Sequence, residues 1–201
     1  MLFTETALKG AFVIGLDRKT DLRGYFARTF CVEEFQSHGL NPRVVQCNVS
    51  FNAHKGTLRG MHWQAPPSAE AKLVRAMRGA IHDVIVDLRA DSPTYLQHVA
   101  VELSSTNCQM LYIPEGFAHG FQTLEDDTEV FYQMSEFYAP GFARGARWND
   151  LAFGIPWPLP NPIMNDRDQS WPDYGNSAKR SRSRAVIDTV ASRREHCEVE
   201  R

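Results

Sequence analysis

The stretch KGTLRGMHWQAPPSAEAKLVR, residues 55–75, organises the interpretation of the whole chain. Two short apolar runs, Thr57–Leu58 and Leu73–Val74, flank its polar middle. Pro66 and Pro67 interrupt that middle, and proline removes a backbone donor and breaks a helix interior. The stretch is therefore predicted to form a strand, a bend and a second strand.

Side chains of a regular strand alternate between its two faces, so the first strand has two predicted faces. One face carries Arg59, Met61 and Trp63, and the other carries Leu58, Gly60, His62 and Gln64. Because Gly60 has no side chain, we expect open space beside the imidazole of His62, as in a ligand pocket. The alternative is an ordinary charged surface hairpin.

Length and composition predict one soluble domain. A chain of 201 residues can bury a substantial core, and its formal net charge of −2 indicates neither a nucleic-acid nor a membrane partner. Residues 176–201 are predicted to form a basic, flexible tail, with a loose terminal helix as the alternative. The four cysteines are widely spaced, which predicts free thiols and a cytoplasmic protein.

Short apolar segments separated by turn signals predict an all-β sandwich or barrel. The expected strands are Ala11–Leu16, Tyr25–Phe30, Val44–Phe51, Leu73–Met77, Ala80–Leu88, Val99–Leu103, Gln109–Ile113, Phe117–Leu124 and Thr128–Tyr138. Ala80–Leu88 is nearly continuously apolar, as expected of a central strand buried on both faces. Cys31–His38 is the best helix candidate, and the chain beyond Pro156 is expected to be irregular.

Several polar side chains would meet inside such a barrel. His62, Lys72, His119 and Tyr132 are distant in sequence but suited to an interior that binds a polar ligand. Gln46, Asn48 and Ser50 alternate along one strand and would form a polar ladder. Tyr132 and Tyr138 would share a face if their strand were regular.

Five motifs carry a resemblance to a known family. They are LRGMHWQ at 58–64, AKLVR at 71–75, DVIVDLR at 83–89, DSPTY at 91–95 and IPEGFAHGF at 113–121. Together they resemble the dTDP-4-dehydrorhamnose 3,5-epimerase family, over roughly residues 21–168. The resemblance implies a cupin-type jelly roll with a few short helices, spanning residues 1–175. It also implies no metal or other cofactor, and a homodimer whose N-terminal arm completes the partner's site.

The resemblance also implies roles for individual residues. The catalytic set would be His62 as base, Tyr132 as acid on the opposite face, Asp168 as the partner of His62, and Lys72 near the sugar's C4 oxygen. The substrate-binding set would be Arg23 from the arm, Gln46, Asn48, Arg59, His119 and Tyr138. The implied activity is inversion of C3, C5 or both in a nucleotide-linked 4-keto-6-deoxyhexose, a step of rhamnose-type deoxysugar biosynthesis.

The chemistry of these residue types supports the roles independently. Imidazole, with a reference pKa of about 6.5, can act as a neutral base, and a carboxylate on its far nitrogen fixes the tautomer. A proton next to a ketone is weakly acidic, so the developing enolate oxygen needs a positive donor such as Lys72. Tyrosine, with a reference pKa of about 10, can return a proton from across the ring.

Four positions depart from the family pattern. Arg28 and Ala143 replace acidic residues, and Asn165 and Arg167 replace a serine and a lysine. They leave open the nucleotide base, with dTDP expected and CDP as an alternative, the exact sugar, and whether one or both carbons are inverted.

Two other classes of protein remain open at this point. A metal-dependent cupin such as an oxygenase could use His62, Glu70 and His119, although Gln64 stands where metal cupins carry a second histidine. A non-catalytic sugar-nucleotide-binding cupin would keep the binding residues. It would have no reason to keep His62, Asp168 and Tyr132 together.

Overall fold

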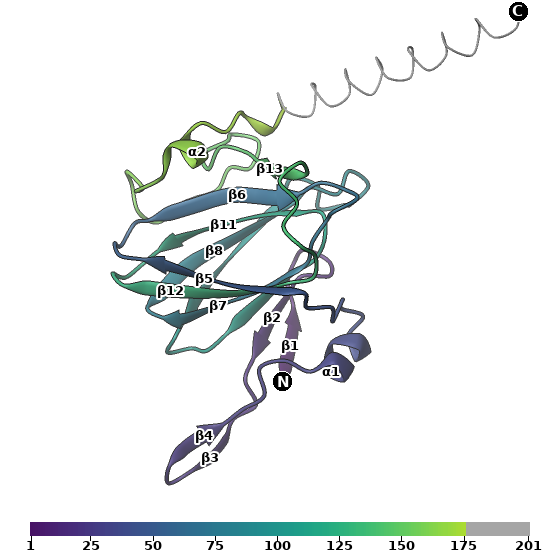
Figure 1. Ribbon diagram of the computed structural model, residues 1–201, viewed down its shortest axis with the longest axis vertical. Helices are drawn as coiled ribbons and strands as arrows, with labels where there is room; N and C mark the ends of the chain where they lie inside the picture. The colour runs from purple at the N-terminus through teal and green to yellow at the C-terminus, as the bar shows by residue number, and fades with distance from the viewer. Residues whose placement is uncertain (176–201) are drawn as a thin grey trace, which may run out of the picture.

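The computed structural model describes residues 1–175, and the chain there forms two facing antiparallel sheets and a separate hairpin (Figure 1). The six-stranded sheet has the order β1 (Leu2–Glu5), β2 (Phe12–Gly15), β10 (Met110–Ile113), β7 (Lys72–Arg78), β12 (Thr128–Met134) and β5 (Gln46–Asn52). The five-stranded sheet has the order β13 (Ala143–Gly145), β6 (Leu58–Gln64), β11 (Phe117–Thr123), β8 (Ala80–Asp87) and β9 (His98–Ser104). The prediction of an all-β fold is confirmed.

The main core lies between the two sheets and follows the alternation of each strand. On β8, Ile81 and Ile85 point into this core, whereas Val84 and Val86 point outward into a second cluster. The strand is therefore buried on both faces, as its continuous apolar character predicts.

Two segments outside the sheets cover their outer faces. Helix α1 (Val32–Ser37) presses Phe35 against the six-stranded sheet, and its position agrees with the helix predicted over Cys31–His38. The C-terminal segment places Phe153 on the outer face of the five-stranded sheet. Ile163 anchors this segment, because its carbonyl accepts from the Leu58 N–H at 2.9 Å and its own N–H donates to Gly56 at 3.0 Å.

Two strands end four residues earlier than predicted, whereas the ends of the others differ by two residues at most. The strand expected over Thr128–Tyr138 ends at Met134, which pairs with Gln46, the first residue of β5, so the ladder has no further partner. Tyr138 therefore lies on the following loop and not on the strand of Tyr132. The strand expected over Tyr25–Phe30 ends at Phe26.

The C-terminal region also departs from expectation. The chain beyond Pro156 is not wholly irregular, since it contains the short helix α2 (Asp166–Gln169). The basic tail and terminal helix predicted for residues 176–201 lie outside the described residues.

An irregularity in β6 overturns the predicted alternation. His62 pairs with His119 of β11, but Arg59 pairs with Phe121, so three steps along β6 match two along β11. Because an extra residue in one strand inverts the alternation beyond it, Arg59 and His62 line the same cavity. The prediction that Arg59 lies opposite His62 is wrong.

The glycines beside the two histidines serve a different purpose from the one predicted. A side chain on Gly60 would meet the Gly120 Cα at 2.6 Å, and one on Gly120 would meet the Met61 sulfur at 2.7 Å. These glycines let β6 and β11 approach each other closely, and Gly60 also has a φ of 121°. They do not provide open space for a ligand.

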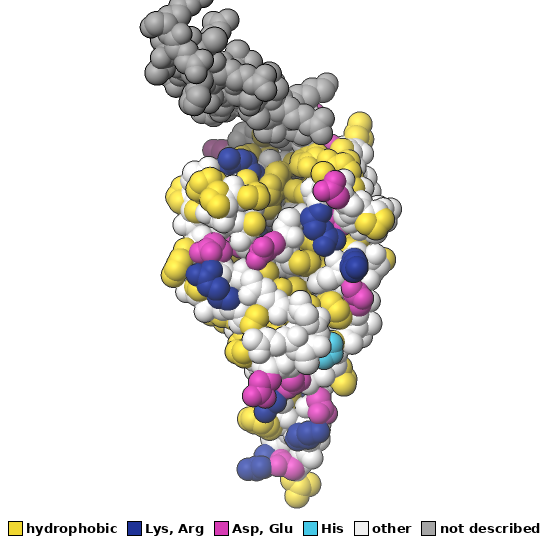
Figure 2. Space-filling model, turned by 90° about the vertical axis from the view of Figure 1, so that its right-hand side faces the viewer, with side chains coloured by type: hydrophobic (Ala, Val, Ile, Leu, Met, Phe, Trp, Pro, Cys, Tyr) yellow, Lys and Arg dark blue, Asp and Glu magenta, His cyan; other side chains and the backbone are white. Residues whose placement is uncertain are grey.

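The hairpin formed by β3 (Lys19–Asp21) and β4 (Gly24–Phe26) projects from the body of the molecule (Figure 1). Figure 2 shows this narrow end with charges of both signs and an apolar tip. Leu22 and Phe26 are exposed there, at 107% and 77%. No helix within residues 1–175 is long and apolar enough to span a bilayer.

Candidate active site

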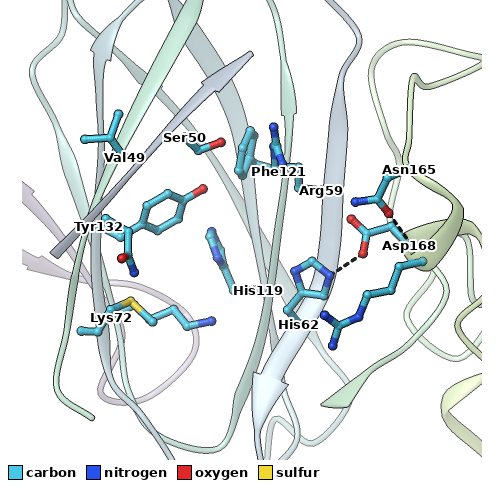
Figure 3. Close-up of a pocket in the computed structure, with 13 residues that line it drawn as sticks. Val49, Ser50, Arg59, His62, Lys72, His119, Phe121, Tyr132, Asn165 and Asp168 are labelled. Carbon is cyan, nitrogen blue, oxygen red and sulfur yellow. Dashed lines mark hydrogen bonds and ion pairs between the residues drawn. The ribbon is translucent and has the colours of Figure 1, made fainter. Parts of the chain in front are cut away.

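A cavity of about 330 Å³ opens between the two sheets, and most of its walls are inward-facing polar side chains (Figure 3). Strands β5, β7 and β12 supply one wall, β6 and β11 supply the other, and α2 closes the side next to β6. The lining comprises Asn48, Val49, Ser50, Arg59, His62, Lys72, His119, Phe121, Tyr132, Met134, Asn165, Arg167 and Asp168.

His62 and Asp168 form the shortest polar pair in this cavity, with 2.6 Å between Nε2 and Oδ1. Asp168 is 2% exposed, and the Gly60 N–H and the Trp171 indole also donate to it. Burial would raise the pKa of Asp168, but the hydrogen bond and charge of His62, with these two donors, hold it below the usual range. An ionised Asp168 accepts from Nε2, which leaves Nδ1 of His62 as the base nitrogen.

Local structure explains how Asp168 reaches His62. The Asn165 side chain caps α2 by accepting from the Asp168 N–H at 2.7 Å. The Trp171 ring lies against Gly145 of β13, where any side chain would collide with the indole. Arg167 also lies over that ring, with 5.2 Å from its guanidinium carbon to the ring centroid.

Tyr132 lies on the opposite side of the cavity from His62, on β12 (Figure 3). Burial raises the pKa of Tyr132, and the charge of Asp83 adds to this, while Arg59 and a hydrogen bond with Ser50 act in the other direction. The phenol is therefore held in its protonated, donor form at neutral pH.

His119 forms a second imidazole–carboxylate pair deeper in the barrel. Its Nε2 lies 2.7 Å from Oδ1 of Asp83, and both side chains are almost fully buried. The other oxygen, Oδ2, is buried without a hydrogen-bond partner among residues 1–175. Asp83 was not among the predicted site residues. Its alternation with Ile81 and Ile85 would have placed this acidic side chain on the inward face of β8.

Lys72 projects into the cavity, and its ammonium group forms an ion pair with Glu70. Its Nζ lies 3.0 Å from Glu70, and the other oxygen of Glu70 accepts from the Gln64 amide at 3.0 Å. Lys72 and Glu70 are both buried, so Glu70 compensates the ammonium and fixes its direction. Glu70 was considered earlier only as a metal ligand.

A second chamber of about 260 Å³ adjoins the first and shares His62, Lys72 and Asn48 with it. Gln46 and Tyr138 line it, and the Gln46 side chain accepts from the Tyr138 N–H at 3.3 Å. Gln46 also donates to Asn48 at 3.2 Å, which agrees with the predicted polar ladder.

Nine of the ten predicted site residues therefore line two connected chambers. The exception is Arg23, which lies on the projecting hairpin with an 89% exposed side chain and binds Asp21. Arg167, noted in the sequence only as a departure from the family pattern, lines both chambers.

The metal site considered from the sequence has no counterpart in the described chain. Within residues 1–175, no three His, Cys, Asp or Glu side chains are grouped so that they could hold a metal ion. The Nε2 atoms of His62 and His119 each bind a carboxylate, and Glu70 binds Lys72.

Two facing antiparallel sheets with a polar cavity between them define a cupin-type jelly roll. The chain belongs to the dTDP-4-dehydrorhamnose 3,5-epimerase family, whose sequence profile matches residues 5–176. It is therefore an epimerase of the isomerase class, and the fold and family predicted from the motifs are confirmed.

Individual relatives agree with this assignment. A dTDP-4-dehydrorhamnose 3,5-epimerase from Methanothermobacter thermautotrophicus is 44% identical over 84% of this chain and 92% of its own. The structure of a Bacillus anthracis dTDP-4-dehydrorhamnose 3,5-epimerase with TDP and PPi bound is 41% identical, with a TM-score of 0.83 over 86% of this chain and 98% of that one. A 3′-monoepimerase from Streptomyces bikiniensis in complex with dTDP-quinovose is 31% identical, with a TM-score of 0.81 over 88% and 89% of the two chains.

Proposed function

We propose that this enzyme inverts C3, C5 or both of a nucleotide-linked 4-keto-6-deoxyhexose, with dTDP as the first candidate carrier, in rhamnose-type deoxysugar biosynthesis. One observation carries the proposal. A carboxylate-bound histidine, His62, and a protonated tyrosine, Tyr132, lie on opposite sides of one cavity. Inversion needs a base on one face of the sugar ring and an acid on the other.

The proposed steps conserve every proton and electron pair. Nδ1 of His62 removes the proton from the carbon next to the ketone, and the C–H electron pair becomes the double bond of an enolate. Asp168 stabilises the imidazolium that forms, and the Lys72 ammonium donates to the enolate oxygen. Tyr132 then protonates the carbon from the opposite face, and the electron pair on the enolate oxygen re-forms the ketone. The Tyr132 phenolate regains a proton from solvent, and the His62 imidazolium releases its proton to solvent. The steps need no oxidant or reductant.

The nucleotide would occupy the second chamber. Gln46, Asn48 and Tyr138 offer amides and an exposed aromatic ring for the base and sugar, whereas Arg59 and Arg167 offer guanidinium groups for the diphosphate. His119 would contact the sugar from the barrel interior. The relatives solved with TDP or with dTDP-quinovose support dTDP as the carrier.

A homodimer with exchanged arms is a further part of the proposal. The β3–β4 hairpin projects from the body with exposed Leu22 and Phe26. Within residues 1–175, Arg23 at its turn binds Asp21 and no cavity residue. Exposed apolar side chains along a projecting hairpin are typical of a surface that a partner covers. Arg23 would then reach the partner's nucleotide chamber.

Subunit complementation tests the arm exchange. Arg23→Ala and His62→Ala chains should each have low activity alone, but a co-expressed heterodimer should regain one working site. No recovery of activity in a heterodimer verified by mass would contradict donation of Arg23 across the dimer.

We place the catalytic unit within residues 1–175 and in the cytoplasm. The free thiols of Cys31, Cys47 and Cys108 support a reducing compartment.

Solvent exchange tests the reaction itself. In heavy water, deuterium should enter C3, C5 or both of a dTDP-4-keto-6-deoxyhexose, and His62→Ala should abolish the exchange. Parallel assays with CDP-, UDP- and GDP-linked sugars identify the carrier. Binding without exchange in all four series would favour a non-catalytic sugar-nucleotide-binding protein.

A further inference from the structure

The guanidinium of Arg59 is held in place by strand β5, on the opposite sheet. Its Nε donates to Oδ1 of Asn52 at 2.8 Å, and its Nη2 donates to the Phe51 carbonyl at 3.4 Å. Within residues 1–175, the two oxygens that accept hydrogen bonds from Arg59 are both uncharged. Arg59 therefore keeps its full positive charge while one edge of its planar group is fixed, which leaves the other edge for the cavity that it lines.

The side-chain amide of Asn52 cannot rotate away from Arg59 without losing two hydrogen bonds. Asn52 is only 2% exposed, and its Nδ2 donates to the carbonyls of Ser50 and Thr128, both at 3.2 Å. Because a buried amide must satisfy its donors, these two carbonyls fix the amide nitrogen and therefore direct Oδ1 toward Arg59. The acceptor is in place before any ligand arrives.

We propose that Asn52 is a positioning residue that aims the uncompensated charge of Arg59 at the oxyanions of a nucleoside diphosphate. The proposal rests on the function proposed above, because it takes the diphosphate of the substrate as the ligand of Arg59. Asn52 does not line the cavity, so it would act on the diphosphate through Arg59. Its Oδ1 also accepts from the Ser50 hydroxyl at 3.5 Å, which adds a second donor to the same oxygen.

A neutral acceptor is the chemically suitable partner for this task. A carboxylate at position 52 would pair with the guanidinium and cancel the charge that attracts the diphosphate. A residue without an acceptor at position 52 would leave the long Arg59 side chain free to rotate. Arg59 would then lose rotamer freedom each time the diphosphate binds, which would weaken binding. Asn52 avoids both losses.

A double-mutant cycle on dTDP binding, measured by titration calorimetry, tests the proposal. Asn52→Ala should weaken dTDP binding roughly tenfold in the wild-type chain, and should have no further effect in an Arg59→Ala chain. Asn52→Leu, which keeps the side-chain volume but has no acceptor, serves the same cycle if urea unfolding shows that the alanine variant does not fold.

Gln122→Ala is the matched control. Gln122 is a fully buried amide on β11 that exchanges two hydrogen bonds of 3.0 Å with Leu159, and it does not line the cavity. It should lower stability while leaving dTDP affinity unchanged. Such a result separates positioning of Arg59 from general loss of structure.

The outcomes distinguish the two proposals. Weakened binding by Arg59→Ala beside unchanged binding by Asn52→Ala would overturn the positioning role alone. If Asn52→Ala weakened dTDP binding equally in the Arg59→Ala chain, the positioning role alone would again be overturned. Normal dTDP binding by Arg59→Ala would overturn the role of Arg59 in the proposed function and the positioning role with it.

Discussion

The carboxylate of Asp168, on a four-residue helix, lies 2.6 Å from the ring nitrogen of His62, which stands 106 positions earlier in the chain. His62 belongs to the barrel, whereas Asp168 belongs to the segment that packs over it. The proposed base therefore depends on the packing of the C-terminal segment against the sheet that carries His62.

The first prediction concerns this pair. Asp168→Asn should lower kcat by about 10²–10⁴-fold, because the amide no longer stabilises an imidazolium and can select the wrong tautomer. The affinity for dTDP should change little, since the nucleotide chamber is intact. Steady-state kinetics and calorimetry measure the two effects. Equal losses of kcat and dTDP affinity would show that Asp168 instead shapes the whole site.

A second prediction separates the acid from the base. Tyr132→Phe should lower formation of the inverted sugar by about 10²–10⁴-fold while deuterium exchange at the carbon facing His62 continues. The reason is that His62 can still remove and return a proton on its own face. NMR of the reaction in heavy water measures both rates. If both fell equally in a folded variant, Tyr132 would only shape the cavity.

The close approach of β6 and β11 gives a third prediction. Gly60→Ala should destabilise the protein by about 2–4 kcal/mol, because the new methyl group would meet the Gly120 backbone and Gly60 has a positive φ. Gly141→Ala is the control, since nothing lies within 4 Å of its side-chain position. Urea unfolding compares them. A Gly60→Ala chain as stable as Gly141→Ala would refute the packing explanation.

A fourth prediction concerns pH. Burial alone would raise the pKa of Asp87, but hydrogen bonds from Arg89, Ser92 and Thr94 lower it far below its usual value. Its stabilising contribution is therefore complete above the ordinary aspartate range and is lost as pH falls through the lowered pKa. Asp87→Asn should cost about 3 kcal/mol at pH 7. It should also reduce the loss of stability that the wild type shows as pH falls below about 4.

Asp91→Asn is the matched control for Asp87, because Asp91 lies exposed on the same loop. It should leave the free energy of unfolding within about 0.5 kcal/mol of the wild type. Denaturant unfolding between pH 7 and 3 measures all three proteins. Identical acid dependence of the wild type and Asp87→Asn would contradict the assignment.

The strands could be predicted from short stretches of sequence, because the burial of each strand face determines which of its residues are apolar. Ala80–Asp87 is largely apolar because both of its faces are covered, and polar side chains alternate along β5 because Asn48 and Ser50 line the cavity. The ends were less predictable, since β12 ends where its partner β5 ends, which is a property of another segment.

The site needed information that no local pattern contains. The face of Arg59 depends on the register between β6 and β11, so strict alternation placed it wrongly. Gly60 could equally have made room for a ligand or for a neighbouring strand, and only the fold shows that Gly120 occupies that space. Asp168 entered through family resemblance alone, because nothing in its surroundings indicates a partner so far away in the chain.

The anchoring of the C-terminal segment through Ile163 has a consequence for synthesis and turnover. Every strand of the barrel precedes this segment, so a chain emerging from the ribosome can complete the barrel before the carboxylate partner of His62 exists. A cut between β13 and α2 would likewise remove the covalent link between the strand that carries His62 and the helix that carries Asp168. The pair of His62 and Asp168 can therefore form only after the last segment of residues 1–175 has been made.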